Sequence, residues 1–346
     1  MSVTIAEIAK KAGVSAGTVS RVLNGKNKEN RPAIAKRSEQ IRRIAQEIGY
    51  RPNQAARTMR QGRFGCVGFL SCSDPTADYF EVALLHGIQR GLAETGNRLL
   101  MCELPMASFE DSSTIPQVLD EYSVDGLLIE FMYDMPEETL ARINQLSIPY
   151  VWLNAKKAHN CVYPNDFAGG RLAAKHLLEL GHTRIAYVSF HEADGYIHYS
   201  VHDRADGFST AMQDAGLEPL RTVITGGFVH GLGLEQARAL LDSPDRPTAV
   251  ICYERHETVA MWSAAMSLGI RIPEDLSLIC FGSDMMRNHT GLPVTTLITP
   301  FAEVGEAAVE VLMAEILAGE PVPATRAIPY VIAPSRSCAP PTEKRP

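Results

Sequence analysis

The sequence lacks any long apolar run, since no stretch approaches the ~18 residues that a membrane-spanning helix needs. Its first eleven residues mix charged and aliphatic side chains and contain no small-residue cleavage site. No secretory signal is therefore visible, and we expect a cytoplasmic protein with no membrane contact. The seven cysteines are odd in number and include no CxxC pair, so they form neither a disulfide framework nor a zinc-knuckle spacing.

Motifs of catalysis are also missing. No phosphate-binding GxxxxGK[ST] occurs, and residues 231–233 lack the third glycine and the strand of a dinucleotide loop. Residues 13–17 spell the GxSxG of a hydrolase, but they follow a predicted helix instead of a strand. His191, His198 and His202 are too loosely spaced for metal ligands that converge on one ion. We therefore expect no enzyme, no cofactor and no metal.

The charge of the chain is unevenly distributed. Its 346 residues predict two or three domains, and 45% hydrophobic with 21% charged residues is typical of a soluble globular protein. Residues 1–63 contain fourteen Lys and Arg against four Asp and Glu, a net charge of +10, which leaves −17 for the rest. A basic head on an acidic body indicates that only the head meets a polyanion. The alternative is a solvated basic surface without a partner.

The head is predicted to consist of short helices. Apolar residues in 5–12 recur on one helical face, and Thr4 begins that helix with a capping-box signature. Gly13 ends it, and Ser15 caps a second helix after a tight turn. A third apolar stripe follows at residues 41–48. A helical hairpin this tight is either a generic packing unit or a DNA-reading helix-turn-helix.

From residue 64 onward, short apolar strands alternate with amphipathic helices. The predicted strands are 66–70, 99–102, 126–129, 151–153, 185–188, 250–252 and 278–281. The predicted helices are 82–95, 168–180, 204–215, 256–268 and 301–317. This alternation is typical of parallel sheets covered on both faces, and its length predicts two lobes that the chain crosses around residues 154–165. A ligand is expected between them, at the carboxyl ends of the strands.

Residues 3–24, VTIAEIAKKAGVSAGTVSRVLN, and residues 49–57, GYRPNQAAR, closely resemble the head of the lactose-repressor/galactose-repressor family of bacterial transcription regulators. Further matching segments are 180–186, 204–208, 272–277, 293–297 and 336–341. The resemblance implies an all-α helix-turn-helix head on an α/β body with two Rossmann-like lobes, as in periplasmic binding proteins. It further implies a homodimer, or a higher oligomer, that represses transcription from double-stranded operator DNA under control of a small-molecule effector such as a sugar.

Three domains are expected on this basis. Residues 1–50 form the DNA-binding domain, residues 51–63 a hinge helix and linker, and residues 64–340 the body. Within the body, lobe 1 takes about 64–160 and 295–320, and lobe 2 takes about 161–294 and 321–340. Two alternatives are a solute-binding protein, which lacks a basic head and begins with a signal peptide, and an α/β enzyme that uses the cleft.

The resemblance also assigns DNA-contacting positions. Those that match phosphate contacts are Thr4, Ser15, Thr18, Ser20 and Asn24, and those that match base contacts are Ala16, Gly17 and Arg21. Because Ala16 offers only a methyl group and Gly17 none, direct readout depends on Arg21, whose guanidinium suits guanine O6 and N7. In the hinge segment, Asn53, Ala56 and Met59 are the expected contacts, with Met59 as the apolar wedge. Without DNA this segment could be a disordered linker. The loop of residues 25–34 is about four residues longer than usual for the family.

The expected effector-binding residues are more scattered along the chain. Arg204 matches an arginine that binds ligand hydroxyls or carboxylates, and the aromatic candidates for stacking on a ligand ring are Tyr79, Phe80, Phe228 and Phe301. For each aromatic residue, packing in the core is the alternative. The aspartate that the family places after Gly282 is Ser283 here, so Glu254 is expected to supply the missing acceptor. The alternative is a ligand other than a simple sugar.

Overall fold

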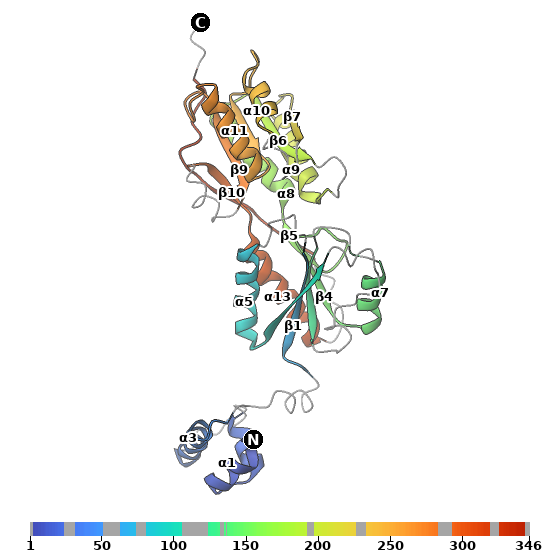
Figure 1. Cartoon of the computed structure of the whole chain (residues 1–346), viewed down its shortest axis with the longest axis vertical. Coiled ribbons are helices and arrows are strands. Elements are labelled where there is room, and N and C mark those ends of the chain that lie inside the picture. The colour runs from blue at the N-terminus through green and yellow to red at the C-terminus, as the bar shows by residue number, and fades with distance from the viewer. Residues whose placement is uncertain are drawn as a thin grey trace. The chain divides into compact units, whose positions relative to one another are not determined.

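The computed structural model describes residues 3–23, 32–50, 63–73, 81–105, 124–131, 135, 137–191, 197–225, 233–282, 293–318 and 325–342. The chain divides into two compact units, Met1–Phe64 and Gly65–Pro346 (Figure 1). The expected hinge helix falls on residues outside the described part, so its conformation stays a prediction. No helix among the described residues is long and apolar enough to cross a bilayer.

The described part of the first unit has three helices: α1 (Ile5–Ala12), α2 (Ala16–Leu23) and α3 (Pro32–Glu47). Thr4 caps α1 in a complete capping box with Glu7, and Gly13 ends α1 in the left-handed conformation, at φ +64°. These two predicted features are confirmed. The helices pack around a small core in which Ile8, Val19 and Ile41 are fully buried.

The first sheet of the second unit is entirely parallel. Its strands are β1 (Cys66–Ser73), β2 (Arg98–Pro105), β3 (Gly126–Glu130), β4 (Tyr150–Leu153), β5 (Cys161–Pro164) and β11 (Thr325–Ile328), in the order β11-β5-β4-β3-β1-β2. Helices α5 (Val82–Thr95) and α13 (Phe301–Ala318) pack on one face, and α7 (Glu137–Leu146) lies on the other (Figure 1). We call this sheet with these helices the first lobe.

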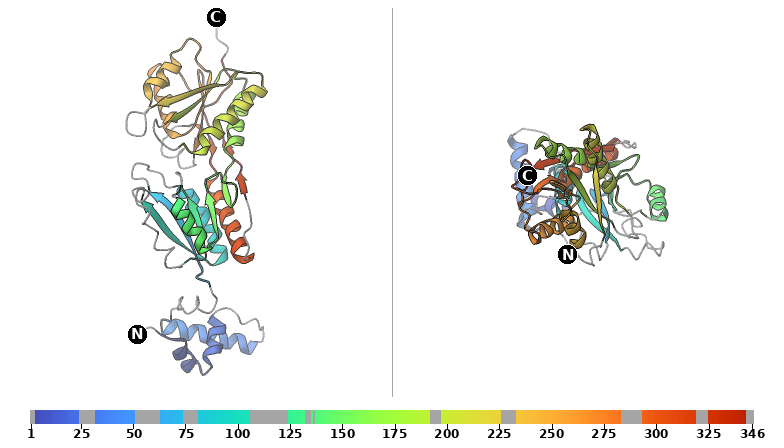
Figure 2. Two further views of the ribbon diagram at one scale, coloured as in Figure 1. Left: turned by 90° about the vertical axis from the view of Figure 1, so that its right-hand side faces the viewer. Right: turned by 90° about the horizontal axis from the view of Figure 1, so that it is seen from above.

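The second sheet repeats this arrangement with one antiparallel edge. Its strands are β6 (Ile185–His191), β7 (Leu220–Thr225), β8 (Ala249–Cys252), β9 (Ser277–Gly282), β10 (Thr295–Ile298) and β12 (Val331–Ala333), in the order β12-β10-β9-β8-β6-β7. Helices α8 (Asp166–Glu179) and α9 (Tyr199–Asp214) cover one face, and α10 (Leu234–Leu241) and α11 (Arg255–Ser267) cover the other (Figure 2). This is the second lobe. The two sheets bear out the predicted α/β architecture.

The chain passes between the lobes at three points: from β5 to α8, from β10 to α13, and from β11 to β12. The strands at these crossings differ from the predicted lobe boundaries. Residues 161–164 and 325–328 were expected in lobe 2 but pair in the first sheet, and residues 295–298 were expected in lobe 1 but pair in the second. A strand belongs to the sheet in which its hydrogen-bonded neighbours lie. The local apolar pattern of the strand does not identify those neighbours.

Candidate functional site

The exposed side of α2 in the first unit carries most of the predicted DNA contacts. Ser15 caps this helix as expected: its Oγ accepts from the backbone N–H of Thr18 at 3.2 Å and lies 3.0 Å from the Thr18 hydroxyl. Ala16, Gly17 and Arg21 are exposed, whereas Val19 and Val22 on the opposite side are buried in the core. The helix therefore presents one row of small and cationic side chains to solvent and anchors itself by the other.

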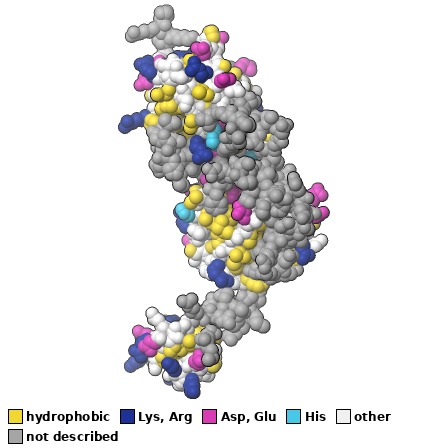
Figure 3. All heavy atoms as spheres, in the orientation of Figure 1, with side chains coloured by type: hydrophobic (Ala, Val, Ile, Leu, Met, Phe, Trp, Pro, Cys, Tyr) yellow, Lys and Arg dark blue, Asp and Glu magenta, His cyan; other side chains and the backbone are white. Residues whose placement is uncertain are grey.

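Other described parts of the first unit also carry exposed cations. Thr4 is exposed, and Ser20 is half-buried. On α3 the exposed cations are Lys36, Arg37, Arg42 and Arg43, of which Arg43 lies 3.6 Å from Glu47. Figure 3 shows Lys and Arg side chains on the face of this unit that is in view. The predicted contacts Asn24, Asn53, Ala56 and Met59 lie outside the described residues.

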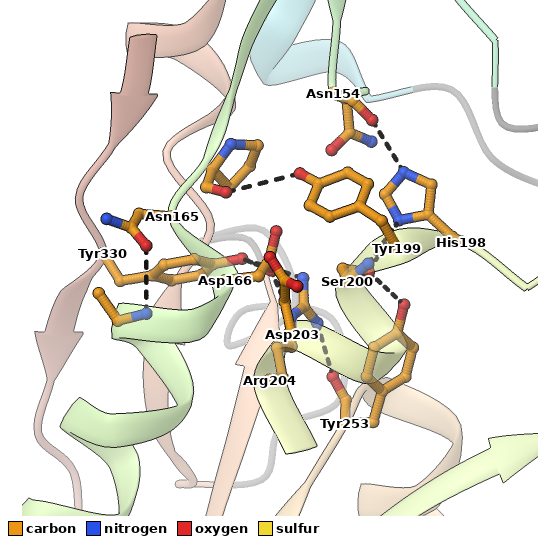
Figure 4. Close-up of polar contacts among 12 residues, drawn as sticks. Asn154, Asn165, Asp166, His198, Tyr199, Ser200, Asp203, Arg204, Tyr253 and Tyr330 are labelled. Atoms are coloured by element: carbon orange, nitrogen blue, oxygen red, sulfur yellow. Dashed lines mark hydrogen bonds and ion pairs between the residues drawn. The ribbon is translucent and has the colours of Figure 1, made fainter. Parts of the chain in front are cut away.

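In the second unit, Arg204 on α9 is the centre of a buried polar cluster (Figure 4). Only 8% of its surface is exposed. Its Nε donates to Asp166 Oδ1 at 2.6 Å, and its Nη1 donates to the backbone oxygen of Tyr253 at 2.9 Å. Its Nη2 donates to the hydroxyl of Tyr330 at 3.0 Å. The guanidinium also lies over the Tyr253 and Phe281 rings, with 4.7 and 4.5 Å to the ring centroids.

Asp166 is the first residue of α8 and is fully buried at the crossing from β5. Its Oδ1 accepts a second hydrogen bond, from the Tyr330 hydroxyl at 2.6 Å. Burial raises the pKa of Tyr330 well above its ordinary value, so this hydroxyl keeps its proton and donates it. Asp166 Oδ2 has no hydrogen-bond partner among the described residues. A buried carboxylate oxygen of this kind is an acceptor that a ligand donor can satisfy.

Next to this cluster, α9 begins with a chain of hydrogen bonds. The hydroxyls of Tyr253 and Ser200 lie 2.8 Å apart, and Ser200 Oγ lies 2.8 Å from His198 Nδ1. His198 Nε2 lies 2.8 Å from the backbone oxygen of Asn154, which follows β4 in the first lobe (Figure 4). The polar cluster thus reaches from the second lobe to the first.

Of the other predicted effector residues, the structure describes Glu254 and Phe301. Glu254 directly precedes α11, where burial, followed by repulsion from Glu257, raises its pKa to about 8. Phe301 begins α13 and is buried in the core of the first lobe with Val67 and Phe69. Tyr79, Phe80 and Phe228 lie outside the described residues.

Sequence reasoning missed most partners of Arg204. Asp166, Tyr253 and Tyr330 belong to three segments that are far apart in the sequence, and none has a local motif. For Asp166 a signal existed, because its carboxylate comes two residues after the end of β5 and begins α8. Ligands of parallel sheets bind at such strand ends.

Comparison with known proteins gives two matches to sequence families. Residues 4–53 match "Bacterial regulatory proteins, lacI family", and residues 174–338 match a periplasmic binding protein-like domain. Among curated proteins, the HTH-type transcriptional repressor PurR of Aliivibrio fischeri (strain MJ11) is 30% identical over 320 residues, which covers 90% of this chain and 91% of that protein. PurR of Vibrio vulnificus (strain CMCP6) is 29% identical over 318 residues, with 90% and 92% covered.

Solved structures share the fold over most of the chain. The lac repressor dimer bound to operator and the anti-inducer ONPF has a TM-score of 0.74 at 20% identity, covering 98% of this chain and 100% of that one. The complex of the transcriptional regulator CelR with cellobiose has a TM-score of 0.64 at 23% identity, with 97% and 99% covered. A regulator from Enterococcus faecium with bound ribose has a TM-score of 0.63 at 25% identity, with 80% and 99% covered.

Proposed function

The chain belongs to the lacI family of bacterial regulatory proteins. From this premise we propose a separate function in repression for each of its two units. The first unit binds operator DNA, and the second unit binds a small molecule between its lobes that controls this binding. The protein acts as a homodimer in the cytoplasm, where operator DNA is found. The cleft binds its ligand without converting it.

The observation that carries the DNA-binding role is the exposed side of α2. Its first turn is free of bulky side chains at Ala16 and Gly17, so the helix can approach a groove closely, and Arg21 is the long side chain that reaches base edges. Ser15 and Thr18 provide hydroxyls at the helix N-terminus, where backbone N–H groups favour a phosphate.

The effector role is supported by the cluster around Arg204. Three of the five N–H donors of its guanidinium bond to oxygens of the protein, which leaves one N–H on Nη1 and one on Nη2. The acceptor that stays open is Asp166 Oδ2. A hydroxyl-rich, uncharged ligand such as a sugar supplies the donor that this oxygen needs, whereas an acid brings a second negative charge. Two of the similar structures hold sugars, cellobiose and ribose.

A thermal-shift screen of the full chain tests the ligand class. Sugars, sugar acids, phosphosugars and nucleobases are added one at a time, and a ligand that binds the folded state raises the melting temperature by mass action. We expect hits among neutral sugars and none among acids. Asp166→Asn should abolish the shift, while Glu179→Gln on the exposed side of the same helix should keep it. A sugar acid that binds tightly, or a hit unaffected by Asp166→Asn, would overturn the assignment.

Selection from a random duplex library tests the DNA role. A dimer with two-fold symmetry should enrich a palindrome whose half-sites lie about one helical turn apart. Recovery of no common sequence at low salt would contradict the proposal. Chemical analysis of the bound ligand after prolonged incubation tests the absence of turnover, since a converted ligand would indicate an enzyme.

A further inference from the structure

The first turn of α9 joins the two lobes through side chains. His198 Nε2 lies 2.8 Å from the Asn154 backbone oxygen, and Lys156 Nζ lies 2.7 Å from Asp203 Oδ2. The Tyr199 ring packs edge-on against Tyr163 of β5 at a centroid distance of 5.8 Å. Asn154, Lys156 and Tyr163 all belong to the first lobe, so α9 is attached at its N-terminus to the lobe opposite its own sheet.

The hydrogen bonds of His198 define where its proton lies. The Asn154 oxygen can only accept, so Nε2 carries the hydrogen and donates it. The Ser200 backbone N–H, 3.4 Å from Nδ1, can only donate, so Nδ1 carries a lone pair. The Ser200 hydroxyl therefore also donates to Nδ1, and the Tyr253 hydroxyl donates to Ser200 Oγ. The neutral Nε2–H form of His198 satisfies all of these hydrogen bonds.

The same turn sets the position of the arginine. Ser200 and Arg204 are four residues apart and lie on one face of α9. Beyond Arg204, α9 is held tightly on α8, since a Cβ on Gly170 would lie 2.0 Å from the Arg204 backbone oxygen. Tyr253 connects the first turn of α9 to the Arg204 guanidinium: its hydroxyl lies 2.8 Å from Ser200 Oγ, and its backbone oxygen accepts from Arg204 Nη1 at 2.9 Å.

We propose that His198 is a positioning residue that latches the two lobes together and thereby holds Arg204 in the ligand site. The proposal deepens the proposed function and rests on it for the role of Arg204. The latch consists of the Asn154 oxygen, His198, Ser200 and Tyr253, and it closes when the neutral imidazole bridges the lobes. Ligand binding at Asp166 and the relative position of the lobes are coupled through it.

The latch has a pH dependence with a defined sign. Burial lowers the pKa of His198 below its ordinary 6.5; hydrogen bonding to Asn154 and the charges of Asp166 and Asp203 oppose this, and the charge of Arg204 adds to it. The latched state thus favours the neutral ring. It is fully formed above pH 6.5 and weakens as the pH falls from 6.5 toward the lowered pKa. A proton on Nδ1 would face the Ser200 N–H and leave that donor without its acceptor.

Two substitutions at His198 separate its functions. In His198→Gln the amide N–H2 can reach the Asn154 oxygen, so the link between the lobes is kept but no longer titrates. In His198→Asn the shorter side chain can still cap α9 but cannot reach Asn154. His202→Asn, on the exposed side of the same helix, is the matched control.

Amide hydrogen exchange of the full chain, followed by mass spectrometry, reads the latch without any ligand or DNA. At about pH 7.5 we expect His198→Asn to raise the exchange of peptides around residues 154–160 and 198–204 roughly five- to tenfold, as the loss of one hydrogen bond predicts. His198→Gln and His202→Asn should match the parent. At about pH 5.5, after correction for intrinsic rates, the parent and His202→Asn should loosen in the same peptides, and His198→Gln should not.

Nitrogen NMR shifts of the imidazole should show the Nε2–H form at neutral pH, and the Arg204 Nε–H signal should exchange faster with solvent in His198→Asn. Exchange in His198→Asn equal to the parent, loosening of His198→Gln at low pH, or a proton on Nδ1 would each overturn the latch. These measurements use no effector. A failed ligand screen with a normal latch would therefore count against the proposed function alone, and the reverse result against the latch alone.

Discussion

The two candidate sites use their side chains in opposite ways. In the first unit, all described predicted contacts except Thr4 follow one another along α2 and its N-cap and are mostly exposed, with the fold held by Val19 and Val22 on the other side. In the second unit, Arg204 and Asp166 are buried and bond to each other and to tyrosines from distant segments. In the first unit binding and stability are therefore separable, whereas in the second the residues proposed to meet the ligand also hold α8, α9 and Tyr330 together.

The largest effect is expected from Arg204→Ala. The change leaves the buried Asp166 carboxylate without its cation, which costs about 3–5 kcal/mol of unfolding free energy for the second unit. Arg171→Ala on the neighbouring α8 removes only an exposed ion pair with Asp214 and should cost less than about 1 kcal/mol. Chemical denaturation measures both. In the remaining folded protein DNA binding should persist and the effector response should be lost. Equal stabilities of the two variants would break the comparison.

A pair of glycine substitutions should change stability in opposite directions in the two units. At Gly170 an added Cβ would meet the Arg204 backbone oxygen at 2.0 Å, so Gly170→Ala should destabilise the second unit by about 2–3 kcal/mol. At Gly17 the nearest atom is Ser15 Oγ at 3.9 Å, so Gly17→Ala should stabilise the first unit by up to about 1 kcal/mol through helix propensity. Thermal unfolding followed for each unit checks the signs. Tolerance of alanine at Gly170 would contradict the close contact of α8 and α9.

The same contrast explains what the sequence can predict. Thr4, Gly13 and Ser15 act on neighbours within a few residues, so their caps and turn were predictable from local chemistry. Predicted helix 82–95 coincides with α5 because its apolar face has a period of its own. Strands β5, β7, β10, β11 and β12 were not predicted. Neither were α7 and α10, which have 10 and 8 residues and are shorter than the 14-residue α5.

The cluster around Arg204 brings together residues that are far apart in the sequence, so no local pattern predicts it. Tyr330 lies 126 residues from Arg204 in the sequence. It contacts Arg204 because it stands where the chain crosses from β11 in the first sheet to β12 in the second. Arg204 itself was singled out from the family resemblance, which gave its position but not its partners. The reason is physical: the hydrogen bonds to Asp166 and Tyr330 join segments that lie 38 and 126 residues from Arg204, and a single sequence holds no record of that pairing.

In the first unit, a substitution of Arg21 tests whether binding can be lost without a loss of stability. Arg21→Ala should weaken binding to the selected operator by about 1–3 kcal/mol and relax the choice of base, since a fork onto a guanine edge is lost. The melting temperature should not change, because the Arg21 side chain is exposed. Arg43→Ala on α3, also exposed, is the control for loss of one charge. A variant that binds operator as selectively as the parent would remove Arg21 from the interface.

The smallest expected effect concerns the response of stability to pH. Glu130 ends β3, where burial, followed by repulsion from Glu81, raises the pKa of its carboxyl from 4.5 to about 8. The folded state therefore holds this proton more tightly than the unfolded chain. Its contribution is complete below pH 4.5 and is lost as the pH rises toward 8. Glu130→Gln cannot ionise and should stay more stable than the parent at pH 8 by about 1–2 kcal/mol, allowing for partial exposure. Denaturation at several pH values measures this difference.

Glu39→Gln, on the exposed surface of α3, controls for the loss of one carboxyl. If both variants followed the parent curve from pH 5 to 8, Glu130 would be as well solvated as a head residue, and the contrast between an exposed site and a buried one would not extend to the first lobe.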